Sequence, residues 1–201
     1  MADSPVPLCQ RLAAHRGLNT VLPSYMYSLG YHPTQAGAAI LAVGLIGVVS
    51  TPLGGVISDR LILRGMETVK ARAYVMAIPG FLVAGVATVL FPFLARSNYA
   101  ALLLMAVLAG WGVPLTNASI GALPTDMLQS PDRAGKLFGL IILVGISGGV
   151  IAPYVITAIS ASAGWIVAFA VLGIGALIGM TIGLIIPRFQ HAIPAEPLER
   201  K

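Results

Sequence analysis

Residues 54–65 read Gly-Gly-Val-Ile-Ser-Asp-Arg-Leu-Ile-Leu-Arg-Gly, and they lead into Glu67, Lys70 and Arg72. The stretch up to residue 72 holds six of the nineteen charged residues of the chain, although it lies between two long apolar runs. Charges gathered between apolar runs are typical of a loop that connects two membrane-spanning helices. The stretch therefore predicts a loop at a membrane surface, and the runs on either side predict the spans.

The composition excludes an ordinary water-soluble domain. Hydrophobic residues make up 57% of the 201 residues and charged residues only 9%, whereas a soluble domain averages about 25% charged residues. The mean hydropathy is +0.90. The net charge of +5 does not indicate a nucleic-acid partner, because the cations lie at the ends of apolar runs and form no stripe with aromatic residues. The expected partner is a lipid bilayer.

The apolar runs predict an all-α integral membrane protein. A span needs about 20 apolar residues to cross about 30 Å of hydrocarbon. Five full transmembrane helices are predicted at residues 34–58, 73–95, 98–125, 136–160 and 164–187. The last two share one charge-free stretch, which the small residues Ser-Ala-Ser-Ala-Gly at 160–164 divide.

The start of the chain differs from the rest. Residues 18–30 are apolar, but a helix of that length reaches only about 20 Å, so a partial helix is predicted there. Residues 1–17 are more polar and predict an atypical, disordered N-terminal segment. A transmembrane helical bundle is thus expected over residues 18–190, followed by a cytoplasmic tail at 191–201.

The distribution of Lys and Arg predicts the orientation. The connections after the five full spans hold four, one, two and none, and the tail holds three. Because Lys and Arg are enriched in cytoplasmic loops, the first and third connections and the C-terminus are expected in the cytoplasm. We expect a multi-pass protein of the plasma (inner) membrane.

The chain carries no pattern of an enzyme. The three histidines, His15, His32 and His191, lie far apart without metal-ligand spacing. Nucleophile elbows and phosphate-binding or dinucleotide-binding motifs are absent from the sequence. A membrane enzyme would be expected to carry ionisable residues deep in its spans, and the five full spans have none. No metal or cofactor is predicted.

Uncharged polar residues within the spans are the candidates for a substrate site, because polar groups at the bilayer centre are costly. The Asn117 amide can donate two hydrogen bonds to a carboxylate. The predicted substrate-binding residues are Tyr25, Tyr27, Trp111, Thr116, Asn117, Ser147 and Tyr154. Taken singly, each is more often an interhelical hydrogen bond or an interfacial aromatic than a ligand. Asp126, Asp132 and Arg133 lie at a cytoplasmic helix boundary and are expected to be solvated or to cap a helix.

The stretch that opens this section resembles the signature loop of the major facilitator superfamily, Gly-x-x-x-Asp-Arg-x-Gly-Arg-Arg. The matching residues are Gly55, Asp59, Arg60 and Arg64, while Ile62 and Leu63 replace a Gly and an Arg of that pattern. Three short stretches, Ser-Asp-Arg-Leu at 58–61, Leu-Pro-Ser-Tyr at 22–25 and Gly-Gly-Val-Ile-Ala-Pro at 148–153, look more specifically like the anion:cation symporter family.

This resemblance implies one six-helix half of the major facilitator fold, namely helices seven to twelve with helix seven truncated. It implies a secondary transporter that moves small organic anions, such as sugar acids or aromatic carboxylates, by proton-coupled alternating access. The coupling ion would be a proton or another cation, and the N-terminal six-helix half would be the partner. Gly55, Asp59, Arg60 and Arg64 would form the conformational-switch loop.

The same charged stretch has a plainer interpretation, in which its cations only set the topology. The short first helix and the unusual residues 1–17 also favour an alternative function. In that alternative the chain is a truncated or split membrane fragment, which has no transport activity by itself and needs a second six-helix half.

Overall fold

The computed structural model describes residues 21–96, 98–128 and 131–189. Residues 21–28 are helical and are followed by α2 (Pro33–Leu63). The next span is continuous and consists of α3 (Thr68–Val75), the π-helix η1 (Met76–Leu82) and α4 (Val83–Leu94). The chain ends in α5 (Tyr99–Met127), α6 (Pro131–Ala163) and α7 (Trp165–Phe189). The expected segments 1–17 and 191–201 lie outside the described residues.

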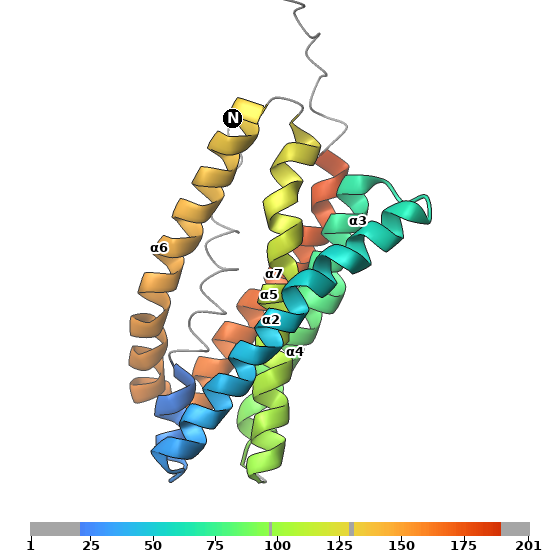
Figure 1. Cartoon of the computed structure of the whole chain (residues 1–201). Coiled ribbons are helices and arrows are strands. Elements are labelled where there is room, and N and C mark those ends of the chain that lie inside the picture. The colour runs from blue at the N-terminus through green and yellow to red at the C-terminus, as the bar shows by residue number, and fades with distance from the viewer. Residues whose placement is uncertain (1–20, 97, 129–130, 190–201) are drawn as a thin grey trace, which may run out of the picture.

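The described residues contain five helices that are long and apolar enough to cross a membrane. Successive spans run in opposite directions, so that the connections alternate between two ends of the bundle (Figure 1). The predicted all-α membrane fold with five full transmembrane helices is confirmed.

Local signals fix where the helices begin. Pro33 occupies the first turn of α2, where its missing N–H costs nothing, and the backbone N–H of His32 donates to Gln35 Oε1 at 2.9 Å. Asn98 caps α5, since its side-chain oxygen accepts a hydrogen bond from the N–H of Ala101 at 2.7 Å. Tyr99 then donates from its hydroxyl to the carbonyl oxygen of Gln35 at 2.9 Å and ties α5 to the start of α2.

Three connections among the described residues turn through glycines in the left-handed region. Gly30 before α2 has φ +84°, Gly65 after α2 has φ +92°, and Gly164 between α6 and α7 has φ +84°. Only glycine adopts this conformation without a steric penalty. The chain therefore reverses at Gly164, at the end of the small-residue stretch.

Residues 54–58 were predicted both as the end of the first span and as the start of the charged loop, and the expectation of a loop at residues 59–63 was wrong. These residues form the last turns of α2, which ends at Leu63, and only residues 64–67 connect α2 to α3. The helix satisfies its own backbone amides, and Gly54 and Ser58 are buried, so this part of α2 still packs against the bundle. Charged residues on a helix end thus looked like a loop in the sequence.

Aromatic side chains fill the core at one end of the bundle. Tyr25 lies 4.9 Å from Phe169, 5.4 Å from Trp165 and 5.6 Å from Phe91, measured between ring centroids. Its hydroxyl donates to the Pro92 carbonyl oxygen at 3.4 Å. This cluster attaches the partial helix to α4 and α7.

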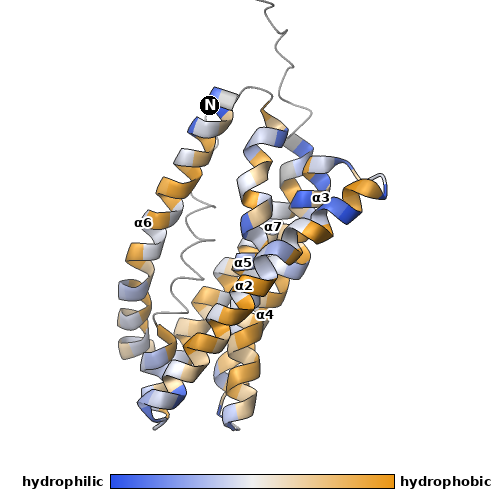
Figure 2. Ribbon diagram, in the orientation of Figure 1, coloured by the Kyte–Doolittle hydropathy of each residue, from blue (hydrophilic) through white to orange (hydrophobic). Residues whose placement is uncertain are grey.

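Large apolar side chains cover the outside of the spans. The apolar windows of α2 and α6 are the least buried of the five, and their exposed residues include Leu41, Leu45, Val48, Leu143, Val150 and Ile151. Figure 2 shows hydrophobic residues along the lengths of the spans and hydrophilic residues gathered around α3. A bundle with this surface is suited to hydrocarbon and not to water.

Candidate functional site

The contact between α2 and α5 brings two backbones close together. A Cβ atom on Gly54 would overlap the carbonyl oxygen of Leu115, and one on Gly47 would lie 3.3 Å from Pro114 Cγ. On α5, a Cβ on Gly110 would lie 2.6 Å from Val43 Cγ1. Small residues allow this close approach. In lipid, the resulting van der Waals packing drives helix association, because the hydrophobic effect does not act between helices there. The contact fixes the middle of α5 against α2.

The four residues of the predicted switch lie at one end of α2. Gly55 is half-buried, whereas Asp59, Arg60 and Arg64 are exposed. Among the described residues, Asp59 has no ion-pair partner within 4.0 Å, although Arg60 and Arg64 are near in sequence. The structure therefore presents these three charges on the surface of a single bundle.

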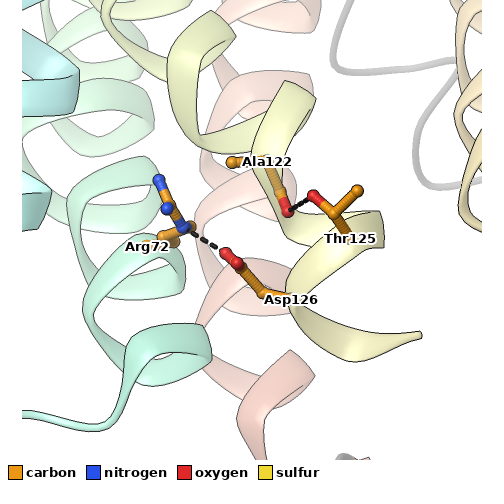
Figure 3. A network of polar contacts seen from close by, with 4 residues as sticks. All are labelled: Arg72, Ala122, Thr125 and Asp126. Carbon is orange, nitrogen blue, oxygen red and sulfur yellow. Dashed lines mark hydrogen bonds and ion pairs between the residues drawn. The ribbon is translucent and has the colours of Figure 1, made fainter. Parts of the chain in front are cut away.

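An ion pair lies at the same end of the bundle, between Arg72 of α3 and Asp126 of α5. Arg72 Nε contacts Asp126 Oδ2, and the two side chains are only 16% and 21% exposed (Figure 3). Beside it, Thr125 donates from its hydroxyl to the Ala122 carbonyl oxygen at 2.7 Å. Asp126 is therefore a partly buried ion-pair partner, whereas the sequence predicted a solvated or capping residue. The sequence did contain a signal for this pair. Arg72 directly precedes one predicted span and Asp126 directly follows the next, so both lie at the same side of the membrane.

The candidate residues on α5 occupy different environments. Trp111 donates from its indole N–H to the carbonyl oxygen of Pro79 in η1 at 3.1 Å. Thr116 is fully buried and donates to the Val113 carbonyl oxygen at 2.8 Å. Asn117, on the next position, is exposed. Of these three, only Asn117 keeps its side-chain donors free for a ligand among the described residues.

The other candidates also differ in how far they are buried. Tyr25 is buried in the aromatic cluster, while Tyr27 and Tyr154 are 51% and 80% exposed. Ser147 is exposed and donates to the Leu143 carbonyl oxygen of its own helix at 2.9 Å. The seven predicted substrate-binding residues thus lie on the partial helix, α5 and α6, and they range from fully buried to exposed.

Two buried side-chain hydroxyls are not among the predicted substrate-binding residues. Ser58 of α2 and Ser119 of α5 are fully buried, and neither side-chain oxygen has a hydrogen-bond partner among the described residues. Ser119 follows Asn117 by two residues in the same polar stretch of α5. Within the described residues, no three His, Cys, Asp or Glu side chains lie together as metal ligands.

The described residues form a pocket of about 380 Å³ at the surface of the bundle. Its walls come from α3 and from the end of α7. The lining residues are Glu67, Lys70, Ala73, Tyr74, Leu184, Pro187 and Arg188. None of the predicted substrate-binding residues lines it.

Long apolar helices of alternating direction, with their charges at the ends, define a multi-pass helical membrane protein. The match to a known family is more specific, because the Major Facilitator Superfamily matches residues 11–200. The chain belongs to the Major Facilitator Superfamily, which is a family of membrane transporters. The predicted family is confirmed at this level.

Proposed function

We propose that the chain is one six-helix half of a secondary transporter that carries small organic anions by proton-coupled alternating access. Membership of the superfamily is the observation that carries this proposal. Alternating access in such folds rocks one bundle against the other around a site near the bilayer midplane. The chain supplies one of the two bundles.

An exposed stripe on α5 supports a substrate path along this helix. Asn117, Gly121 and Thr125 follow one another at intervals of four residues, and all three are exposed. One turn or more earlier on the same face, Gly110 and Pro114 are buried against α2. Along this face, α5 therefore changes near its middle from residues packed against α2 to exposed residues. A substrate held between the two six-helix halves would reach Asn117 there.

The least buried spans indicate where the second half would contact this bundle. α2 and α6 expose most of their apolar surface, and the exposed stripe of α5 belongs to the helix that α2 contacts through Gly54. A second bundle seated on α2 and α6 would cover this stripe and enclose a path between the halves. Lipid would then cover the remaining outer faces.

The organic-anion class rests on the resemblance of residues 22–25, 58–61 and 148–153 to the anion:cation symporter family. Asn117 fits a carboxylate, because its amide offers two donors without the desolvation cost of a buried charge. The five full spans contain no ionisable residue deep in the bilayer. We therefore place the proton-binding carboxylate on the second half.

Uptake into proteoliposomes tests this function. The chain is reconstituted together with its natural six-helix partner, and uptake of radiolabelled sugar acids and aromatic carboxylates is measured with and without an inward proton gradient. We expect saturable, gradient-dependent uptake of at least one anion, and Asn117→Ala should raise its KM by about tenfold, the loss of one charge-assisted hydrogen bond. Thr181→Ala is the control, because Thr181 is exposed on α7 and bonds only within its own helix. Binding and transport of no carboxylate would overturn the proposal.

The same proteoliposomes distinguish the transporter from the alternative, a fragment that has no transport activity by itself. The chain alone is compared with the chain and partner together, and the DNA upstream of the Met1 codon is sequenced to find a frame for six helices. Such a frame, with uptake restored by its product, supports the transporter. The absence of any partner that restores uptake supports the fragment.

A further inference from the structure

The pocket between α3 and α7 belongs to no part of the proposed transport path. Its lining combines charged and apolar side chains. Lys70 and Arg188 bring positive charge from two different helices, while Ala73, Leu184 and Pro187 are apolar. Its volume of about 380 Å³ lies in the range of small-molecule sites, which is about 300–1,000 Å³.

Helix geometry places the two cations at one depth. A Cβ atom on Gly183 would lie 3.4 Å from Ala77 Cβ and 3.7 Å from the Ala73 carbonyl oxygen, so these positions are level. Arg188 follows Gly183 by about 7.5 Å along α7 at 1.5 Å per residue. Because α3 runs in the opposite direction, the same distance along α3 leads back to the turn that contains Lys70. Two exposed cations therefore flank the mouth of the pocket.

The apolar lining lies on the membrane side of these cations. Ala73 and Tyr74 are three and four residues beyond Lys70, on the same face of α3. Leu184 precedes Arg188 by one turn of α7, at the end of its apolar span. The pocket is thus charged at the bundle end and apolar toward the hydrocarbon, with the half-exposed ring of Tyr74 at the boundary.

The charge balance favours an anion at the mouth. Among the described residues, neither Lys70 nor Arg188 has an ion-pair partner within 4.0 Å. Glu67 also lines the pocket, but it precedes Lys70 by three residues and lies about one turn further into the water. The lining therefore carries two positive charges against one negative charge.

We propose that this pocket binds an anionic phospholipid, with its phosphate between Lys70 and Arg188 and an acyl chain along Ala73, Tyr74 and Leu184. A bilayer supplies this ligand at high local concentration, and cytoplasmic leaflets are rich in anionic lipids that basic pockets at helix ends recognise. Inorganic phosphate shares the charged part of the site but would leave the apolar part empty. The proposal depends only on membrane insertion and not on the transported substrate.

Native mass spectrometry of the full chain, released from detergent micelles, tests the site. The chain is titrated with phosphatidylglycerol and with phosphatidylcholine of the same acyl chains. Each cation contributes about fivefold to the binding of an anionic lipid, so Lys70→Gln and Arg188→Gln should each weaken phosphatidylglycerol binding about fivefold. The double variant should weaken it about 30-fold. Phosphatidylcholine binding should stay unchanged.

Two further variants keep the test decisive. Lys136→Gln removes an exposed cation at the same end of the bundle, on α6, and should leave lipid binding as in the wild type. Glu67→Gln removes the opposing charge and should strengthen phosphatidylglycerol binding, a gain that a misfolded protein cannot show. Equal affinity for the two lipids, or an equal loss in Lys136→Gln, would overturn the proposal. Displacement of the lipid by an equimolar amount of inorganic phosphate would overturn it in favour of a soluble anion.

Discussion

Single glycines decide how closely two spans of this bundle approach. At Gly54 a Cβ would overlap the backbone carbonyl oxygen of Leu115, and a backbone cannot rotate away as a side chain does. We expect Gly54→Ala to destabilise the bundle by about 2 kcal/mol or more, seen as a lower midpoint of thermal unfolding in detergent. Gly44→Ala, on the same helix with open space around its Cβ position, should leave the midpoint unchanged or raise it. Equal midpoints for the two variants would contradict the α2–α5 contact.

The ion pair of Arg72 and Asp126 is the second feature that acts through single residues. Since about four fifths of each side chain is buried, removing one partner leaves a largely desolvated charge behind. Arg72→Gln or Asp126→Asn should each cost about 2 kcal/mol of stability, and the double variant should cost less than the sum. Thermal unfolding of this double-mutant cycle measures the coupling. Asp132→Asn, an exposed acidic residue at the start of α6, serves as the control. Additive costs would show that the two side chains do not interact.

At the same scale, the sequence identified which span residues are polar but not which of them are buried. Asn117 was chosen because an uncharged polar group in a span is costly, and it is the exposed one of the three α5 candidates. Tyr25 has the same polarity in the sequence, yet its ring lies in the core because three aromatic rings from α4 and α7 surround it. Burial of that kind depends on contacts between distant residues, and local composition does not contain them.

At the scale of elements, apolar length predicted the spans and charge misled at their ends. Residues 59–63 looked like a loop because charge begins at residue 59, but α2 continues through them to Leu63. A helix that leaves the bilayer keeps its internal hydrogen bonds in water, so a change in polarity does not end it. The π-helix η1 was not predicted either. This π-helix spans Met76–Leu82 and contains Pro79.

The π-helix yields a prediction about local opening. π-Bulges are costly segments that are often found at functional sites, and here the Trp111 indole donates to the Pro79 carbonyl oxygen within η1. Trp111→Phe should remove this bond, worth about 1 kcal/mol, and raise the hydrogen-exchange rate of amides in 76–84 about fivefold. Tyr99→Phe is the control, because it loses a similar bond, from Tyr99 of α5 to Gln35 of α2, that does not involve η1. The hypothesis fails if exchange in 76–84 responds equally to both variants, or to neither.

At the scale of the whole molecule, the alternation of the spans turns one loop assignment into an orientation for every connection. The structure places the connection between α2 and α3 and the end of α7 at one end of the bundle, with the start of α2 and the connection between α6 and α7 at the other (Figure 1). The count of Lys and Arg predicts that the first of these ends lies in the cytoplasm. In a Cys9→Ser background, an impermeant maleimide added to intact cells should label His32→Cys and Ser162→Cys, both of which replace exposed residues. Arg64→Cys should react only after the membrane is permeabilised. The reverse pattern would invert the bundle and would place the charged end of α2 and the α3–α7 pocket on the outer surface. Labelling of all three positions from outside would contradict a spanning α2, because His32 and Arg64 flank this helix at its two ends.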